Sequence, residues 1–143
     1  HQEADMIKDR LCTHFSAVFM KLSLRDAARF GQTLLQQGVW QGEQVIPTAA
    51  VQSISGGGDP AKFAGAGYTT LPGGSYRSQW WALQNENGAY SARGIHGQAI
   101  YVDPTAEMVI ARFATFPISF NAAIDPTSLP AYQAVADYLI KKP

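Results

Sequence analysis

Two short runs of strand-forming residues, separated by a turn, constrain the fold more than any other feature of the sequence. Ala99–Asp103 and Met108–Phe113 are rich in β-branched and aromatic residues, and turn formers lie between them. This pattern predicts a β-hairpin. Just upstream, His96 and Gly97 fit a tight reversal that needs a residue at positive φ. We therefore expect an antiparallel sheet that contains this hairpin.

The residues before the reversal predict a stretch of uncovered backbone. Gly94 lies three positions before Gly97, at the end of a strand-like run. A glycine inside a strand usually marks a bulge or the close approach of a ligand or another backbone. We therefore predict a strand edge that is bare near Gly94–Ile95, and we place the candidate chemistry there.

Two further strands are predicted upstream. Residues 79–84 and 89–94 have strand composition and enclose an Asn-Glu-Asn-Gly turn. Together with the hairpin they make four strands joined by short links, which is the pattern of an antiparallel meander. The stretch 63–78 is rich in Gly, Thr, Pro and Tyr and is predicted to be a loop.

Helices that can cover this sheet are predicted near both ends of the chain. Ser23 suits an N-cap, Asp26 completes a capping-box-like pattern, and apolar residues recur at helical spacing up to Gly38. A last helix is predicted to start at Ser128 or Leu129. Because an apolar sheet face must be covered, we predict an α+β fold, an antiparallel meander sheet covered by N-terminal and C-terminal helices.

The composition fits one globular domain, residues 1–143, and disfavours nucleic acid and membranes as partners. Aliphatic and aromatic residues make up 46% of the chain, which supports a core. Lys+Arg and Asp+Glu both number 11, so no net charge attracts nucleic acid or an anionic membrane. The longest apolar run, Phe15–Met20, is far shorter than a membrane span. We predict neither nucleic acid nor membrane as a partner.

No metal or cofactor is predicted. The histidines at positions 1, 14 and 96 are too scattered for a metal site. The glycines at 56–58 lack the Lys-Ser or Lys-Thr of a phosphate loop, since Lys62 precedes Phe63. Cys12 is the single cysteine, so no internal disulfide is possible and the compartment, cytoplasmic or periplasmic, stays undetermined. As a lone thiol in an apolar run, Cys12 is interpreted as a small buried hydrophobe.

The parts of a hydrolase site are only partly present. Such a site needs a nucleophile, a base and a donor to the developing oxyanion. The Ile95 amide is a candidate donor, but Ser-x-x-Lys, Gly-x-Ser-x-Gly and His-Glu-x-x-His are absent from the sequence. His96 fits a site residue or a turn residue equally well. Trp80 and Trp81 lie on opposite strand faces, so one packs in the core while the other lines a pocket or meets a missing partner.

Two segments resemble serine hydrolases related to class C β-lactamases and penicillin-binding proteins. Leu22–Pro47 contains an Arg-Asp-x-x-Arg-Phe-Gly helix, and Tyr90–Ala114 contains a Gly-x-x-Gly-Gln-x-x-x-Val-Asp-Pro hairpin. The second segment is similar to the one that holds the third motif of this superfamily. The branch that the chain most resembles contains the 6-aminohexanoate-dimer hydrolases and related esterases.

The resemblance implies a partial β-lactamase-like fold and an acyl-enzyme mechanism without a cofactor. A serine of a Ser-x-x-Lys motif attacks a small-molecule amide or ester, while that lysine and a motif tyrosine move protons. Carried over to this chain, Gly94 is the motif glycine and Ile95 the oxyanion donor. Arg93 replaces a residue of the family's Lys-Thr or His-Thr pair, so β-lactam hydrolysis is not expected. We predict Trp81, Arg93 and His96 as substrate-binding residues, and an alternative register places His96 in the motif.

The missing motifs lie N-terminal to this region in the family. We therefore expect the chain to be the C-terminal part of a longer serine hydrolase, inactive alone, with residues 1–21 loosely packed or displaced. The N-terminal part of the same enzyme, or a second copy, is expected to cover an exposed sheet face. The alternative is a stand-alone, non-catalytic module that binds a peptide or protein at the exposed strand edge.

Overall fold

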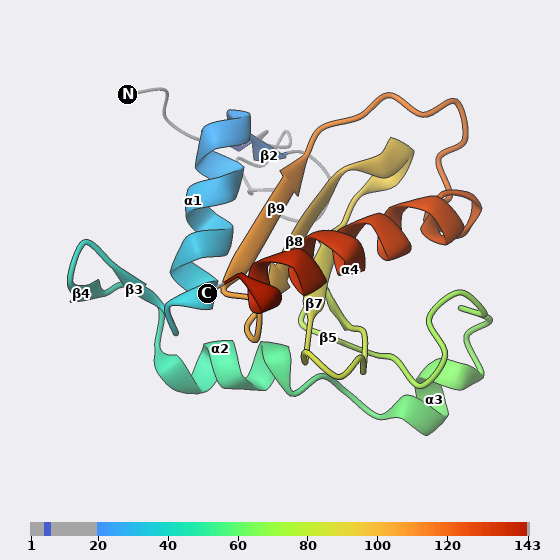
Figure 1. Ribbon diagram of the computed structural model, residues 1–143, viewed down its shortest axis with the longest axis horizontal. Coiled ribbons are helices and arrows are strands. Elements are labelled where there is room, and N and C mark those ends of the chain that lie inside the picture. The colour runs from blue at the N-terminus through green and yellow to red at the C-terminus, as the bar shows by residue number, and fades with distance from the viewer. Residues whose placement is uncertain (1–4, 7–19, 143) are drawn as a thin grey trace, which may run out of the picture.

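A five-stranded antiparallel meander forms the centre of the fold (Figure 1). The computed structural model describes residues 5–6 and 20–142. The strands follow one another in the sheet as β5 (Ser75–Arg77), β6 (Trp80–Ala82), β7 (Tyr90–Arg93), β8 (Ala99–Asp103) and β9 (Met108–Arg112). The predicted meander is confirmed. Strand β5 is additional, because its three residues lie in a Gly- and Pro-rich stretch that has the composition of a loop.

The predicted hairpin and the reversal before it are both present. Strands β8 and β9 pair from Ala99 with Arg112 to Asp103 with Met108. Between β7 and β8 the chain reverses through the 3₁₀ turn η1 (Ile95–Gly97), in which His96 has φ 54° and Gly97 φ 87°. A left-handed pair of this kind is what a tight reversal requires.

Helix α1 (Leu24–Leu35) begins and ends as its sequence predicts. The Asp26 amide donates to Ser23 Oγ at 3.2 Å, and that hydroxyl donates to the Asp26 carboxylate at 2.6 Å. At the other end the Gly38 amide donates to Thr33 O at 2.8 Å, while Gln37 takes the left-handed conformation with φ 56°. This is a Schellman termination, and it also requires a positive φ of 89° at Gly38.

Three other elements differ from their predicted bounds. Helix α3 was not predicted; Asp59 caps it and Pro60 lies in its first turn. Helix α4 begins at Asp125 rather than Ser128, because Pro126 falls in its first turn, where a missing amide costs nothing. The sequence around the Gln-Gly turn predicts strands at Val39–Trp40 and Val45–Ile46, and in the structure the second strand of this small hairpin is Glu43–Gln44 instead. The remaining elements are β1 (Asp5–Met6), β2 (Met20–Lys21), β3 (Val39–Trp40), β4 (Glu43–Gln44), α2 (Thr48–Ser55), α3 (Pro60–Ala64), η2 (Asn121–Ala123) and α4 (Asp125–Lys141). The expectations for residues 1–21, Cys12 and His14 lie outside the described residues, apart from the pairing of β1 with β2.

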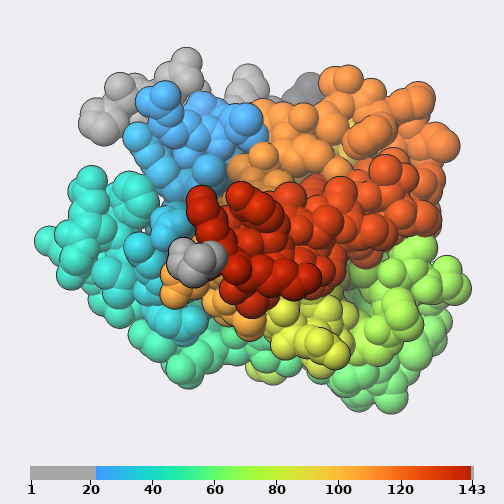
Figure 2. Space-filling model, in the orientation of Figure 1, coloured from blue at the N-terminus to red at the C-terminus, as the bar shows by residue number. Residues whose placement is uncertain are grey.

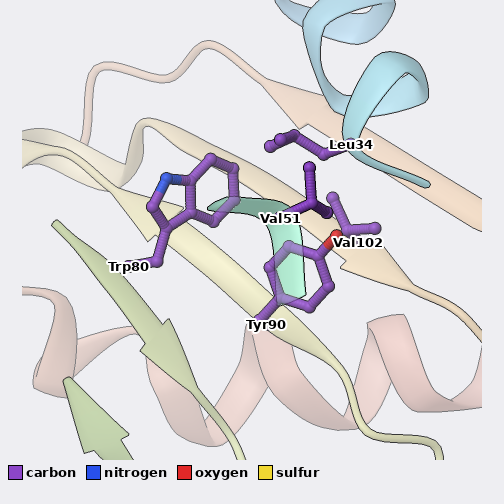
Figure 3. Packing of buried hydrophobic residues seen from close by; sticks show 5 residues of the cluster. All are labelled: Leu34, Val51, Trp80, Tyr90 and Val102. Carbon is purple, nitrogen blue, oxygen red and sulfur yellow. The ribbon is translucent and has the colours of Figure 1, made fainter. Parts of the chain in front are cut away.

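Alternate side chains of the sheet enter two separate cores. Helices α1 and α2 cover one face, over a cluster of Leu34, Val51, Trp80, Tyr90 and Val102 (Figure 3). Helix α4 crosses the other face (Figure 1), over a cluster of Ala89, Tyr101, Ala106, Met108 and Ala136. Both faces of the sheet are therefore covered, unlike the exposed face that we expected.

Exposed apolar side chains lie instead on the outer side of α4, which no other described segment covers in Figure 2. Val135, Tyr138 and Leu139 are 46%, 65% and 40% exposed and follow the i, i+3, i+4 spacing of one helix face. Among the described residues, no helix has the length and apolar content to cross a bilayer.

Burial raises the pKa of Tyr90 to about 12 from an ordinary value of 10.0. Because the folded state favours the neutral phenol, this stabilisation is complete below pH 10 and is lost as the pH rises to 12. The free energy of unfolding of the unmodified protein falls between pH 10 and pH 12. In Tyr90→Phe, which has no phenol to titrate at this position, we expect this fall to be about 2 kcal/mol smaller. Urea unfolding at pH 9 and pH 11.5 measures this. The exposed Tyr138→Phe is the control and should follow the unmodified protein; the same behaviour of Tyr90→Phe would contradict the prediction.

Candidate functional site

A cleft opens where the end of β7 extends beyond its neighbour β6. On one side of β7, strand β6 pairs with Tyr90 and Ser91 alone, whereas on the other side β8 pairs with β7 as far as Arg93. The predicted bare edge is thus the end of an inner strand rather than an outer strand of the sheet. The cleft has a volume of about 130 Å³ and is lined by Tyr68, Trp81, Arg93, Gly94, Ile95, Ser119, Phe120, Asn121, Ala122 and Asp125.

The amide of Ile95 points away from β8, toward the side that β6 leaves uncovered. Gly94 is extended, with φ −101° and ψ 171°, and its amide donates to Gln98 O at 2.9 Å on the β8 side. In an extended residue the N–H and C=O point to the same side, so the next amide points to the opposite side. The Ile95 amide donates no hydrogen bond to any residue within the described part of the chain.

One short segment holds the chain on both sides of Ile95. This segment, residues 119–125, is called the clasp below. The His96 amide donates to Ser119 O at 3.2 Å, Asn121 Nδ2 donates to Gly94 O at 2.9 Å, and the Arg93 guanidinium pairs with Asp125. The three anchors leave the Ile95 amide between them without a partner among the described residues.

The ion pair of Arg93 and Asp125 lies almost wholly inside the protein, with side chains 8% and 4% exposed. Thr70 Oγ1 donates to the second Asp125 oxygen at 2.5 Å. Burial lowers the pKa of Arg93, and the carboxylate beside it opposes that shift. A guanidinium stays protonated at neutral pH, so the pair is ionic. Arg93 lines the cleft with its charge already compensated, and its substrate-binding role stays a prediction.

The two tryptophans divide between core and cleft. Trp80 is 6% exposed and lies in the first core, while Trp81 lines the cleft. The Trp81 ring packs edge-on against Tyr76, with centroids 4.6 Å apart, and Arg93 lies 6.0 Å from its centroid. Trp81 Nε1 is buried without a hydrogen-bond acceptor among the described residues. An acceptor on a ligand would remove the cost of this unmade bond.

His96 is placed differently from the other predicted residues. It is not among the lining residues, and its Nδ1 lies 2.7 Å from Phe116 O. The His96 carbonyl also accepts from the Phe116 amide at 3.2 Å. These contacts connect η1 to the loop that follows β9. The substrate-binding role of His96 stays a prediction.

Several lining residues were not identified from the sequence. Tyr68 comes from the predicted loop 63–78, and Asn121 and Asp125 come from the link before the last predicted helix, without a local motif to single them out. Only the tertiary fold brings them to Gly94. Within the described ranges, no three His, Cys, Asp or Glu residues are grouped so that they could hold a metal ion.

Comparison with known proteins identifies the relatives of the chain. No family model matches the sequence. A 6-aminohexanoate-dimer hydrolase from Paenarthrobacter ureafaciens is 34% identical over 117 residues, which are 81% of this chain and 30% of that protein. The solved structure of a Bacillus anthracis protein, provisionally named a 6-aminohexanoate-dimer hydrolase, has a TM-score of 0.78 and 30% identity. The chain is a relative of the 6-aminohexanoate-dimer hydrolases.

This relationship confirms the resemblance and the partial β-lactamase-like α+β fold predicted from the sequence. The structural match covers 96% of this chain but 34% of the Bacillus anthracis protein. The chain therefore spans about a third of the length of the 6-aminohexanoate-dimer hydrolases that it matches.

Proposed function

We propose that this chain is the oxyanion-binding part of a longer serine hydrolase that cleaves amide or ester bonds. The observation that carries the proposal is the Ile95 amide, which faces the cleft side of β7 without a hydrogen-bond partner among the described residues. An amide held in this way can donate to the oxygen that becomes negative when a carbonyl is attacked. The names of the relatives support hydrolysis as the reaction class.

The proposed reaction divides between this chain and the rest of the enzyme. The serine of a Ser-x-x-Lys motif, which these 143 residues lack, loses its proton to a base and attacks the carbonyl carbon. The carbonyl oxygen takes the negative charge and accepts a hydrogen bond from Ile95 N–H. The leaving group departs with a proton, and water then hydrolyses the acyl-enzyme. We expect the 143-residue chain alone to be inactive.

The cleft walls support a neutral substrate group next to Ile95. Trp81, Tyr68 and Phe120 supply aromatic surface, and the charge of Arg93 is already paired with Asp125. A substrate carboxylate would have no uncompensated cation to meet among the described lining residues. This arrangement supports small amides or esters with aliphatic or aromatic groups and argues against β-lactams, as the sequence predicts.

The rest of the enzyme is also the proposed partner surface. Val135, Tyr138 and Leu139 form an exposed apolar stripe on α4, and such stripes mark surfaces that another part of a protein covers. A second copy of the chain is the alternative cover. The mass of the longer protein in solution separates the two, since a monomer excludes the second copy.

Replacing Ile95 by proline removes the proposed donor with little disturbance of the backbone. Ile95 is the first residue of η1, where proline is tolerated, and Gly94 has the extended conformation that a residue before proline prefers. In the full-length enzyme we expect kcat to fall by about 10²–10³-fold. Ile95→Val keeps the amide and is the control. The measurement is steady-state hydrolysis of a p-nitrophenyl ester.

Two results would overturn the proposal. The first is an unchanged kcat in folded Ile95→Pro, since the amide would then have no part in the reaction. The second is saturable turnover by the isolated 143-residue chain that disappears on mutation of a residue within it, because the nucleophile would then lie inside the chain.

A further inference from the structure

The peptide group between Gly94 and Ile95 carries two polar atoms that point in opposite directions. A trans peptide is planar, so its C=O and N–H are antiparallel and rotate together. The Gly94 carbonyl accepts a hydrogen bond from Asn121 Nδ2 at 2.9 Å. A contact that holds this carbonyl therefore also sets the direction of the Ile95 N–H.

We infer that Asn121 is a positioning residue, which aims the Ile95 amide at the reacting carbonyl by holding the other end of the same peptide group. The inference rests on the proposed function of Ile95. It assigns Asn121 no contact with the substrate. A hydrogen bond accepted by the carbonyl also polarises the peptide and strengthens its N–H as a donor.

This peptide group needs an external hold, because its neighbours leave it free to turn. Gly94 has no side chain to restrict rotation, and the bond from its own amide to Gln98 O fixes only the preceding peptide group. Within the described residues, Asn121 is the one side chain that hydrogen-bonds to either polar atom of the Gly94–Ile95 peptide.

Asn121 is itself well placed to act as a fixed point. Its carbonyl accepts the Ile124 amide at 2.9 Å in the turn that leads into α4. Ser119 and Asp125, on either side of it in the clasp, bond to His96 and Arg93. The Gly94 carbonyl can only accept a hydrogen bond, and only the NH₂ group of the asparagine side chain can donate one. This partner therefore determines which way the side-chain amide of Asn121 is turned.

The test compares Asn121→Ala and Asn121→Asp in the full-length enzyme. Asn121→Asp keeps the shape of the side chain but replaces the donor by an acceptor. For both variants we expect kcat to fall about tenfold while KM stays within about twofold, because the aim of the donor matters most in the transition state. Asn87→Ala is the matched control, since it removes a comparable amide bond, 2.9 Å to Asp103, on a turn remote from the cleft.

The infrared stretch of the acyl-enzyme carbonyl gives a readout that a merely structural role would not move. A hydrogen bond from the Ile95 amide lowers the stretching frequency of the ester carbonyl. In folded Asn121→Ala we expect this frequency to rise toward that of an ester without such a hydrogen bond. Unchanged kcat and an unchanged band in Asn121→Asp, together with loss of activity in Ile95→Pro, would overturn the inference and leave the proposed function standing. An active Ile95→Pro would overturn both.

Discussion

Replacing Asp125 by alanine is expected to lower the free energy of unfolding by about 3–5 kcal/mol. The substitution leaves the Arg93 guanidinium, 8% exposed, without its carboxylate inside the protein, and leaves the Thr70 hydroxyl without its acceptor. Because a buried charge cannot recover its hydration, the loss exceeds that from any exposed ion pair. Urea unfolding monitored by tryptophan fluorescence gives the value.

Two further variants identify the cause of this loss. Arg29→Ala breaks the exposed pair of Arg29 and Asp26, in which the two side chains are 47% and 26% exposed. It should lower the free energy of unfolding far less, because solvent screens this pair. The double variant Asp125→Leu with Arg93→Met replaces the buried pair by apolar groups and should recover most of the stability. A loss in Asp125→Ala no larger than that in Arg29→Ala would contradict the assignment.

Replacing Gly38 by alanine is expected to destabilise the protein by about 2–5 kcal/mol, through two effects that add. The first is conformational, because φ is 89° and an L side chain resists the left-handed region. The second is steric, since a Cβ atom at this position would lie 2.0 Å from the Ile46 carbonyl oxygen. Backbone atoms cannot rotate away from such a contact, so the α1 terminus or the following hairpin must shift.

Gly42 provides a matched control for the conformational effect alone. Its φ is 87°, close to that of Gly38, but no atom lies within 4 Å of its added Cβ. We expect Gly42→Ala to cost about 1–2 kcal/mol, and the difference between the two variants measures the steric effect. Equal losses at the two positions would show that the contact with Ile46 relaxes without cost.

The parts of the fold that follow from short-range signals were predictable. The capping pattern of Ser23 and Asp26 locates the start of α1, and strand composition locates β8 and β9 to within one residue. Strand β5 was missed because its three residues lie in a Gly- and Pro-rich stretch and are held by pairing with β6. Helix α3 was missed because its five residues are too few to show an apolar period, although Asp59 and Pro60 are a local start signal. The start of α4 was placed late because Pro126 in a first turn looks like a helix breaker in the sequence alone.

The residues of the candidate site also divide into those that a local pattern indicated and those that it did not. A local pattern drew attention to Gly94 and Ile95, and the alternation along β6 predicted that one of its two tryptophans faces away from the core. In the structure this residue is Trp81. Asn121 and Asp125 were not predicted, since 27 and 32 positions separate them from their partners Gly94 and Arg93. Contacts at such separations depend on the packing of α4 against the sheet, which no local pattern encodes.

The clasp also sets where the connection between β9 and α4 can change length. Ala114 and Phe116 bond to Gln98 and His96, and from Ser119 onward the chain is anchored again. Pro117 and Ile118 are the exposed link between these two anchored stretches. An insertion there would bulge into solvent. An insertion inside 119–125 would instead move Ser119, Asn121 and Asp125 away from their hydrogen-bond and ion-pair partners. Loop grafts intended to change selectivity should therefore be spliced at Pro117–Ile118.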